Sequence, residues 1–441
     1  MISREQNDLI TRTGPGAPCG TLMRQYWQPV ALAVELQGPR PLRPVRLLGQ
    51  DLVVFRDEAG RLALIDRDCP HRGADLAYGR LEDGGLRCPF HGWLFDVAGN
   101  CREMPGEPDG GGALCQRVKQ KTYPVAERAG IIWGYLGAGE PPAFPDFDCF
   151  IAPDSHVFAF KGHMDCNWLQ ALEVGIDPAH ASFLHRFEED ESAGGSNTYG
   201  RQFRAASMGS DIPMTTLLRE FPRPDIDVQP VPWGLRLFSR RRIDPQRTHL
   251  RVTNLIFPNS FLIPLSGEMT ITQWHVPVDD TSNYWYAIFT SFGGPVDKKT
   301  MTEQRLELYQ LPDYKPRLGR HNEWGYDPAE QRSKTFTGMG FDINVHDQWA
   351  CESQGAIQDR TREHLGTTDK AIIANRRLLV KAIEQAQAGE RPPMVLDRAS
   401  AAGMTGPATM DAIGPTEGWE SFWPEIDRKR RDSAPWKRSA A

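Results

Sequence analysis

Two short Cys/His motifs place the strongest constraint on how this chain of 441 residues can fold. The first is Cys69-Pro70-His71, and the second, sixteen residues later, is Cys88-Pro89-Phe90-His91. Two such pairs indicate two loops that close on one metal centre. Their two thiolates and two imidazoles fit a tetrahedral zinc site. They also fit a [2Fe-2S] cluster in which two cysteines bind one iron and two histidines bind the other.

The surroundings of the two motifs favour the iron–sulfur cluster. Each motif supplies one cysteine and one histidine, so both loops can serve both irons. Short apolar runs between turn residues predict strands around them, at 45–48, 52–55, 62–65 and 131–136. We therefore expect an all-β domain of about a hundred residues, over residues 41–145, that holds the cluster. Four unrelated residues in turns are the alternative that involves no metal.

The remaining segments predict a helical lead and a larger mixed domain. Residues 1–40 are expected to form a helical lead that packs on the larger domain. Three prolines between 141 and 145 mark a linker, so the larger domain should span residues 146–441. Its polar, Gly/Ser-rich run 188–197 is expected to be a surface loop. Its predicted helices are 167–174 and 369–388, and its strand-like segments are 250–257, 260–263 and 270–276.

Composition excludes several classes of protein. The formal net charge is −6, whereas nucleic-acid binders normally carry a strong basic excess. No apolar run approaches the roughly 18 residues that span a bilayer, and the first residues lack the apolar core of a signal peptide. Eight cysteines are too few for a disulfide scaffold. We therefore expect a cytoplasmic protein with no nucleic-acid or membrane partner, whose six other cysteines are free thiols.

A second group of metal-ligating residues lies beyond the linker, where His180 and His185 follow a predicted helix. On an ideal α-helix this spacing turns the two rings about 140° apart, so one metal binds both only at a frayed end or a π-type turn. The segment 345–352 offers a carboxylate as a third ligand. Two histidines and one carboxylate form the facial triad of non-haem Fe(II) oxygenases, which leaves positions open for O2. A pair of ordinary helix-surface histidines is the alternative.

With both groups present, the chain resembles the α subunit of a Rieske non-haem iron aromatic-ring hydroxylating oxygenase. It is most similar to the α-only branch that includes phthalate 4,5-dioxygenase and related aromatic-acid oxygenases and O-demethylases. The resemblance covers nearly the whole chain, and it is carried by residues 3–7, the Cys/His loops with their flanks 72–74 and 92–93, 167–185 and 360–366. It implies an α+β fold. An all-β Rieske [2Fe-2S] domain precedes a larger α+β catalytic domain, in which helices flank an antiparallel sheet of the helix-grip type.

The resemblance also implies the role of each site residue. The residues that match the ligands of the Rieske cluster are Cys69, His71, Cys88 and His91. Those that match the ligands of the mononuclear Fe(II) are His180, His185 and Asp347, and Asp342 and Glu352 are competing carboxylates for the last position. Asp177 matches the aspartate that joins an iron-ligand histidine to a Rieske histidine of the neighbouring subunit. Its carboxylate is expected to accept the free imidazole N–H of that ligand and so to fix its tautomer. Because electrons pass between subunits, the family implies a homo-trimer or a hexamer of two trimers, without a β subunit.

The implied function is that of a terminal oxygenase component. A separate reductase with flavin and iron–sulfur centres passes electrons from NAD(P)H to the cluster, which reduces the mononuclear iron, and O2 then oxidises an aromatic substrate. Dioxygenation is expected, and monooxygenation by hydroxylation or by O- or N-demethylation is the alternative within the class. Outside the class stand a Rieske electron carrier without an oxygenase site and a zinc-stabilised binding protein.

The expected substrate is an aromatic carboxylate of the phthalate or benzoate type. Arg219, Arg236 and Arg251 lie in apolar or strand-like surroundings, and a buried guanidinium suits a carboxylate through bidentate hydrogen bonds. Arg251 is the favoured candidate, and surface or ion-paired arginines are the alternative. The run Arg240-Arg241-Arg242 is expected to be solvated.

Overall fold

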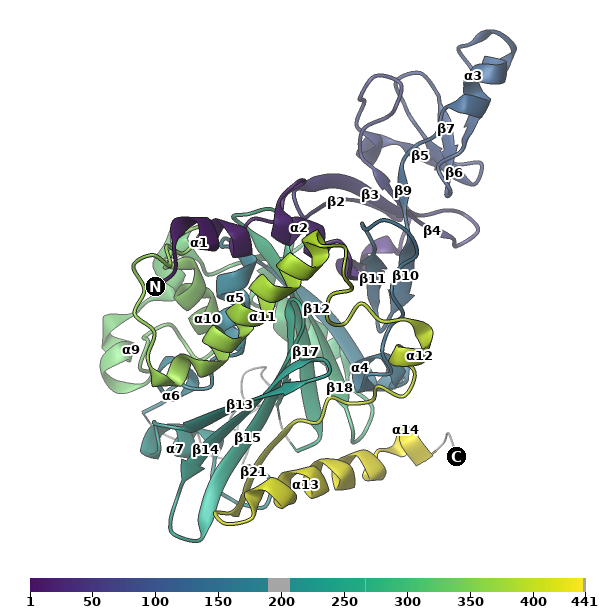
Figure 1. The fold of residues 1–441 in the computed structure, drawn as a ribbon. Coiled ribbons are helices and arrows are strands. Elements are labelled where there is room, and N and C mark those ends of the chain that lie inside the picture. The colour runs from purple at the N-terminus through teal and green to yellow at the C-terminus, as the bar shows by residue number, and fades with distance from the viewer. Residues whose placement is uncertain (189–206, 266, 439–441) are drawn as a thin grey trace. The chain divides into compact units, whose positions relative to one another are not determined.

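The computed structural model describes residues 1–188, 207–265 and 267–438, so residues 189–197 of the predicted polar loop lie outside the described part. The chain divides into two compact units (Figure 1). Thr13–Pro142 is called the Cys/His unit below because it carries both motifs, and Met1–Arg12 together with Ala143–Ala441 is called the large unit. None of the described helices is long and apolar enough to cross a membrane.

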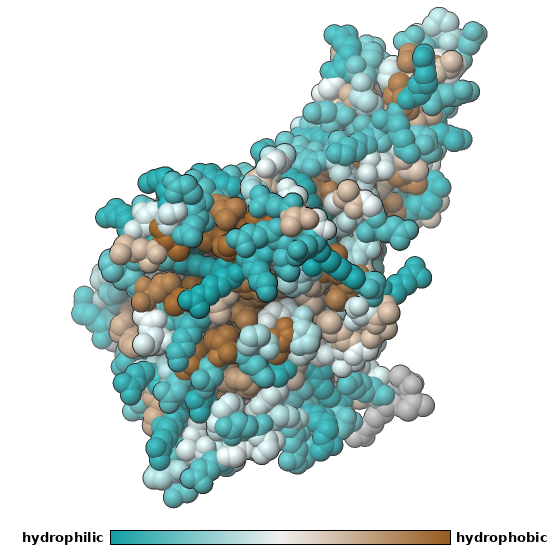
Figure 2. All heavy atoms as spheres, viewed as in Figure 1, coloured by the Kyte–Doolittle hydropathy of each residue, from teal (hydrophilic) through white to brown (hydrophobic). Residues whose placement is uncertain are grey.

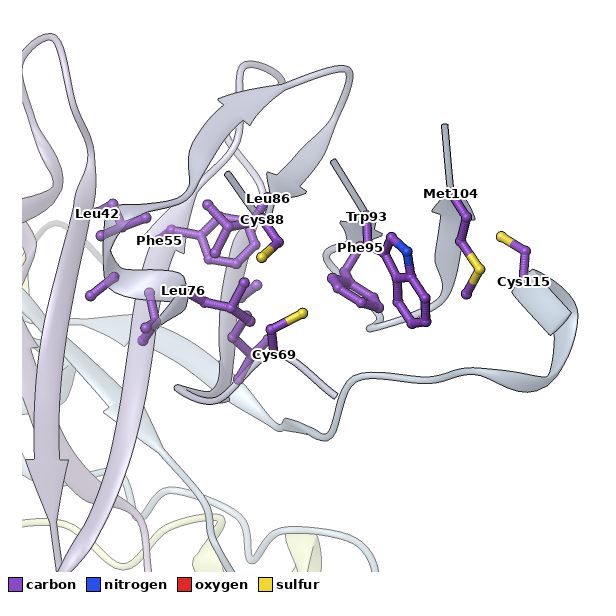
Figure 3. Close-up of a cluster of buried hydrophobic side chains, with 14 residues drawn as sticks. Leu42, Phe55, Cys69, Leu76, Leu86, Cys88, Trp93, Phe95, Met104 and Cys115 are labelled. Atoms are coloured by element: carbon purple, nitrogen blue, oxygen red, sulfur yellow. The ribbon is translucent and has the colours of Figure 1, made fainter. Parts of the chain in front are cut away.

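Three small antiparallel sheets make up the Cys/His unit, with the strand orders β2-β3-β4-β9, β5-β6-β7-β8 and β1-β11-β10. Their strands are β1 (Gln28–Leu32), β2 (Leu42–Leu47), β3 (Gln50–Arg56), β4 (Leu62–Asp66), β5 (Arg80–Glu82), β6 (Gly85–Arg87), β7 (Leu94–Asp96), β8 (Cys101–Glu103), β9 (Thr122–Tyr123), β10 (Val125–Arg128) and β11 (Ile131–Gly134). The helical segments are short: α2 (Pro18–Met23), η1 (Ala33–Leu36), η2 (Leu76–Tyr78), η3 (Pro108–Gly111) and α3 (Gly112–Arg117). The first two sheets share one apolar core that includes Phe55, Leu86 and Phe95 (Figure 3).

Residues 13–40 differ from the predicted helical lead. Of the predicted lead, only the segment with α1 (Arg4–Thr11) belongs to the large unit. A capping box between Ser3 and Gln6 begins this helix. The buried strand β1 pairs antiparallel with β11, where Leu32 lies opposite Ile131. This pairing joins segments far apart in the sequence, so the local pattern of residues 13–40 did not reveal it.

An eight-stranded antiparallel sheet forms the centre of the large unit, in the order β12-β18-β17-β16-β15-β14-β13, with β21 paired to β15. The strands are β12 (Val157–Met164), β13 (Asp225–Val231), β14 (Gly234–Arg242), β15 (Arg247–Ile256), β16 (Ser260–Pro264), β17 (Met269–Pro277), β18 (Asn283–Ser291) and β21 (Met410–Pro415). A two-stranded ribbon consists of β19 (Tyr309–Gln310) and β20 (Lys315–Pro316).

Helices flank this sheet, which confirms the predicted α+β class. They are α4 (Asp148–Ile151), η4 (Asp154–His156), α5 (Trp168–Gly175), α6 (Ala181–Leu184), α7 (Met214–Glu220), α8 (Lys298–Leu306), η6 (Arg320–Gly325), α9 (Pro328–Ser333), α10 (Ile343–Glu352), η7 (Thr367–Asp369), α11 (Lys370–Gln387), α12 (Arg398–Ala401), α13 (Trp419–Ser433) and α14 (Pro435–Arg438). Figure 1 shows α5 and α11 against the sheet, where α5 packs on β16 and β17 and α11 packs on β13 and β14. Along β21, α13 closes a second core with Phe238, Val252 and Trp423.

Candidate metal centres and substrate cavity

Two loops of the same backbone construction carry the Cys/His pairs. In each loop the cysteine N–H donates to the carbonyl five residues later, over 2.8 Å from Cys69 and 2.9 Å from Cys88. A glycine four residues after each cysteine adopts a positive φ, 73° at Gly73 and 76° at Gly92. L side chains avoid this conformation. The turn itself therefore explains the glycines that follow both motifs in the sequence.

The side chains of the two motifs converge. Cys69 and Cys88 are each 2% exposed, and their sulfur atoms point into the same space beside Trp93 (Figure 3). The rings of His71 and His91 meet edge to face with their centroids 4.5 Å apart. His71 also stacks on Trp93 at 4.3 Å, which fixes the plane of its ring. The structure thus brings together all four predicted cluster residues.

These four residues fit an iron–sulfur cluster. The buried His91 Nδ1 has no hydrogen-bond partner among the described residues, and such an atom is costly unless a ligand satisfies it. Burial raises the pKa of the Cys69 thiol to about 11, so this cysteine stays protonated at neutral pH unless a metal stabilises its thiolate. A pair of thiols and a pair of imidazoles from matched loops is the donor set of a Rieske centre.

The two histidines of the second group sit at the two ends of a single helical turn. His180 is the N-cap of α6 and His185 is its C-cap, with φ −106° and ψ 23° outside the helical range. The chain leaves helical geometry at His185, so the spacing of five residues no longer separates the rings. From α10, Asp347 Oδ1 lies 3.2 Å from His185 Nε2 and 3.7 Å from His180 Nε2. The three ligand atoms lie within 4.8 Å of one another.

The charge states of these residues suit a divalent metal. Burial and the neighbouring His185 lower the pKa of His180, so its imidazole is neutral. Burial raises the pKa of Asp347, whereas the contacts with His185 and His180 lower it. The lowering is the larger effect, so the net pKa lies below its usual value. Neutral imidazoles and an ionised carboxylate are the forms that bind metal. Two imidazoles and one carboxylate are also the donors of non-haem Fe(II).

Neither competing carboxylate joins this group. Asp342 is the N-cap of α10, where it accepts from Asn344 N–H, and it pairs with Arg305 at 3.3 Å. Glu352 accepts hydrogen bonds from Trp324 Nε1 at 2.9 Å and from Gln348 Nε2 at 3.1 Å. Both carboxylates already have structural partners.

Asp177 contacts His180 differently from the expectation. Its backbone carbonyl, not its carboxylate, lies 2.5 Å from His180 Nδ1. Its carboxylate Oδ1 accepts from Ala179 N–H at 2.8 Å and so closes the turn that leads into α6. A carbonyl can only accept, so His180 carries its proton on Nδ1 and leaves Nε2 free to bind a metal. The backbone carbonyl of Asp177, and not its carboxylate as predicted, therefore fixes the tautomer of His180.

A cavity of about 130 Å³ adjoins the three ligands. Its walls combine apolar side chains, such as Phe261, Ile271 and Trp285, with the polar Gln273 and His275. An apolar protein cavity of about 150 Å³ holds benzene, so a single aromatic ring is a suitable occupant.

The three predicted substrate arginines occupy different places. Arg251 lines the cavity, donates to Asp411 at 2.8 Å and donates to the Pro264 carbonyl at 2.9 Å. Arg219 pairs with Glu220 in α7 at 3.2 Å. Arg236 lies between two tryptophans, 5.2 Å from the ring of Trp233 and 4.7 Å from that of Trp423. Within the described structure, neither Arg219 nor Arg236 is part of the cavity wall.

Arg241 was not identified from the sequence as a site residue, and the prediction that Arg241 is solvated is wrong. It is 1% exposed and lines the cavity, where it donates to Ser182 Oγ at 2.9 Å and Ser239 Oγ at 3.1 Å. Burial and the neighbouring Arg251 lower its pKa to about 10, so it remains charged at neutral pH. Side chains alternate along a strand, and Arg241 therefore points inward although its neighbours Arg240 and Arg242 do not. Leu235 and Leu237 on the same face of β14 were the signal that could have found it.

Asp177 and His180 also line a surface depression of about 860 Å³. Side chains from α5, α6, α10 and α11 line it. On the face shown in Figure 2, hydrophobic side chains gather around α10 and α11 within a surface that is otherwise mostly hydrophilic. Exposed aromatic rings at the depression include Phe183 and Phe336.

Two family models match the chain over these units. The Rieske [2Fe-2S] domain matches residues 26–124. The model described as LigXa C-terminal domain like matches residues 134–405, which is more than half of the chain.

Relatives of assigned activity match over most of their length. The phthalate 4,5-dioxygenase oxygenase subunit of Pseudomonas putida is 35% identical over 407 residues, which cover 88% of each chain. The 5,5'-dehydrodivanillate O-demethylase oxygenase subunit of Sphingobium sp. is 31% identical over 404 residues, which cover 90% of this chain and 84% of the relative. The crystal structure of dicamba monooxygenase bound to dicamba has a TM-score of 0.56 at 20% identity, covering 84% of this chain and 100% of that chain. At that identity it supports the fold alone.

The two family models and the relatives match most of the chain, and the chain therefore belongs to the Rieske non-haem iron oxygenases. It is similar to the oxygenase subunit of phthalate 4,5-dioxygenase. The predicted fold and enzyme class are confirmed. The matches support a Rieske cluster and iron as cofactors. The assignment of individual ligands stays a prediction.

Proposed function

We propose that this chain is the terminal component of an oxygenase system that uses O2 to hydroxylate an aromatic carboxylate of the phthalate or benzoate type. The observation that carries the proposal is the buried guanidinium of Arg241 in the wall of the cavity that also contains His180 and Asp347. A guanidinium binds a carboxylate through charge-assisted hydrogen bonds. The names of relatives include phthalate and 3-chlorobenzoate, which supports an aromatic acid.

The two donor groups would hold the two metal cofactors. Cys69, His71, Cys88 and His91 would hold the [2Fe-2S] cluster, and His180, His185 and Asp347 would hold Fe(II). When bound, the cluster supplies single electrons and the mononuclear iron supplies the activation of O2.

The chain's own residues bind and orient the substrate. Arg241, with Arg251 beside it, holds the carboxylate at one wall of the cavity. Phe261 and Trp285 enclose the ring and exclude water. Because the carboxylate is fixed, the ring carbon that faces His180, His185 and Asp347 is the one that reacts. The positions of the arginines therefore set the regiochemistry.

Electrons would come from a separate protein. Solved structures of similar fold include complexes of an oxygenase with a ferredoxin. We propose a reductase with flavin and iron–sulfur centres that draws on NAD(P)H in the cytoplasm.

We further propose a homo-trimer or a hexamer of two trimers, in which the Cys/His unit of one subunit docks on the large unit of its neighbour. Asp177 lies in the depression beside the exposed ring of Phe183. The second Cys/His loop exposes Phe90 next to His91. Exposed apolar side chains on both surfaces favour mutual burial. Asp177, whose backbone carbonyl accepts from His180, would then offer its carboxylate to a cluster histidine of the neighbouring subunit.

Monooxygenation is the second candidate, because O-demethylase relatives also match this chain. A screen of aromatic acids and their methyl ethers, with NADH, O2 and a generic reductase, separates the two reactions by product mass. A gain of two oxygen and two hydrogen atoms means dihydroxylation. A gain of one oxygen atom means hydroxylation, and loss of a methylene unit means demethylation. Failure to oxidise any aromatic acid contradicts the proposed substrate class.

Iron analysis tests the ligand assignment. The wild-type chain should hold the two irons of a Rieske cluster and one mononuclear iron. Asp347→Ala should lose only the mononuclear iron and keep the visible absorption of the cluster, whereas Cys88→Ser should lose that absorption. Two irons in the wild-type chain, with no O2 consumption, would indicate an electron carrier, and zinc without visible absorption would indicate a binding protein.

A further inference from the structure

His346 is a buried histidine that the proposed function leaves without a role. It lies in α10 immediately before Asp347 and is 0% exposed. Its Nε2 lies 3.0 Å from the carbonyl oxygen of Gly340. A carbonyl can only accept a hydrogen bond, so the Nε2 of His346 carries a proton. The ring is fully buried and no carboxylate is hydrogen-bonded to it among the described residues, so it is neutral and its Nδ1 has a free lone pair.

The free nitrogen of His346 faces the ring of His185. The two Nδ1 atoms lie 3.4 Å apart. The ring centroids are 5.6 Å apart with their planes inclined by 25°. These values describe two imidazoles that meet nitrogen to nitrogen and not face to face. Because the His346 nitrogen has no proton, the hydrogen bond between the rings requires that His185 donate from its Nδ1.

This direction of donation determines the free nitrogen of His185. A neutral imidazole has one N–H, so its Nε2 is bare, and this atom lies 3.2 Å from Asp347 Oδ1 among the candidate ligands. The opposite tautomer would set two lone pairs against each other at the contact with His346. His346 thus holds the imidazole of His185 at Nδ1 and leaves its Nε2, beside Asp347, free for a metal.

We propose that His346 is a positioning residue that fixes the tautomer of His185 and aims its Nε2 at the mononuclear iron. The proposal rests on the assignment of His185 as an iron ligand. The other candidate ligand, His180, is held by the backbone carbonyl of Asp177, which no substitution removes. His346 is the acceptor that a side-chain change can delete. Loss of such a partner typically lowers metal affinity 10- to 100-fold.

Three variants of the full-length holoenzyme test this role. His346→Leu removes the acceptor. His346→Gln keeps one, because its amide can donate to the Gly340 carbonyl while its oxygen accepts from His185. His156→Leu is the matched control. His156 is also buried, but its side chain forms a hydrogen bond with Ser155 Oγ and not with a candidate iron ligand. The measurement is the anaerobic dissociation constant for Fe(II), obtained by competition with a chelator. Cluster absorption and the melting temperature are recorded on the same samples.

We expect His346→Leu to bind mononuclear Fe(II) about 10- to 100-fold more weakly than wild type, with unchanged cluster absorption. His346→Gln should recover most of the affinity, and His156→Leu should match wild type. A purely structural role predicts instead that affinity follows the melting temperature in all three variants.

Wild-type Fe(II) affinity in a folded His346→Leu variant would overturn the proposal. If that variant does not fold, His346→Met replaces it, because a thioether is only a weak acceptor. Wild-type affinity in His346→Met then overturns it equally. Failure of the underlying assignment gives a different result, since the wild-type chain would then bind no mononuclear iron at all.

Discussion

Arg251 donates to the carboxylate of Asp411 over 2.8 Å, and this pairing distinguishes it from Arg241 in the same cavity. Asp411 is buried and also faces His249 Nε2 at 3.2 Å. Arg241 has hydroxyl and carbonyl partners, and no carboxylate pairs with it in the part of the chain that the structure describes. Its positive charge is therefore available to an anionic substrate, whereas that of Arg251 is largely neutralised.

Arg241→Met should weaken the binding of aromatic acids. A hydrogen bond to a charged group contributes about 1.5–3 kcal/mol, so we expect KM to rise roughly 10- to 100-fold. The fold should tolerate the change, because an apolar side chain replaces a buried charge. Arg236→Met on the same strand is the control, since Arg236 lies between Trp233 and Trp423 outside the cavity wall. Steady-state kinetics with a series of benzoates provide the measurement. An unchanged KM for every accepted acid would contradict a substrate role for Arg241.

Arg251→Met should act first on stability. It leaves the Asp411 carboxylate buried with one cationic partner fewer, which costs on the order of 3 kcal/mol. The double variant Arg251→Met with Asp411→Asn should recover most of that loss, because no unpaired charge remains. Urea unfolding of the wild type, the single variant and the double variant measures both the loss and the recovery of the free energy of unfolding. If KM also stays at the wild-type value in Arg251→Met, the substrate role that we favoured for Arg251 is excluded.

Glu173 lies at the centre of a buried ion network beside the depression. It accepts from Arg376 at 2.6 Å and from Arg360 at 2.9 Å, and Arg376 also contacts Glu363. Burial raises the pKa of Glu173, but the two guanidinium groups lower it more, so the net pKa lies below the usual value. The ionised carboxylate thus stabilises the fold above the unfolded pKa of about 4.3. This contribution is lost as the pH falls through the lower pKa of the folded state.

Glu173→Gln should therefore destabilise the protein most at neutral pH. Removing one partner of a buried ion pair costs about 3–5 kcal/mol. The difference from wild type should narrow as the pH falls below about 4.3. Free energies of unfolding at several pH values measure this trend, and the exposed Glu420→Gln is the control. A difference that does not depend on pH would mean that shape, and not charge, holds the network together.

The candidate ligand residues could be named from the sequence because short motifs carry them. Cys69 and Cys88 each lie within three residues of a histidine, and each is followed by a glycine that its turn requires. His180 and His185 raised a geometric problem on an ideal helix, and the structure solves it by ending α6 between them. Such local patterns are set by neighbouring residues, so they can be interpreted without tertiary structure.

Other features depend on contacts between distant segments. The pairing of β1 with β11 made residues 28–32 a strand of the Cys/His unit, although their neighbourhood looked helical. Arg241 was predicted to be solvated because it lies inside a charge run. Its burial depends on Ser182 and Pro178, which lie far away in the sequence. His346 meets His185 only after α6 and α10 have packed together. These residues complete the candidate site, and their roles follow from tertiary packing.

Cys101 and Cys115 show no paired spacing in the sequence, yet their sulfur atoms lie 3.2 Å apart between β8 and α3. We expect oxidised glutathione to convert the two thiols into a disulfide, with release of two molecules of reduced glutathione. Burial and the contact with Cys115 raise the pKa of Cys101 to about 12. The attacking species is the thiolate, so the reaction should become faster as the pH rises.

The oxidised protein should lose two titratable thiols when it is assayed unfolded, and a reductant should restore them. Closing a loop of about 15 residues stabilises a fold by about 3 kcal/mol in the chain-entropy model, so the melting temperature should rise on oxidation. Cys101→Ser should abolish both effects. Cys19→Ser is the matched control, because Cys19 is buried in the same unit and its substitution leaves the pair intact. A thiol count that stays constant under oxidising conditions would show that the two sulfur atoms do not approach closely enough to form a bond.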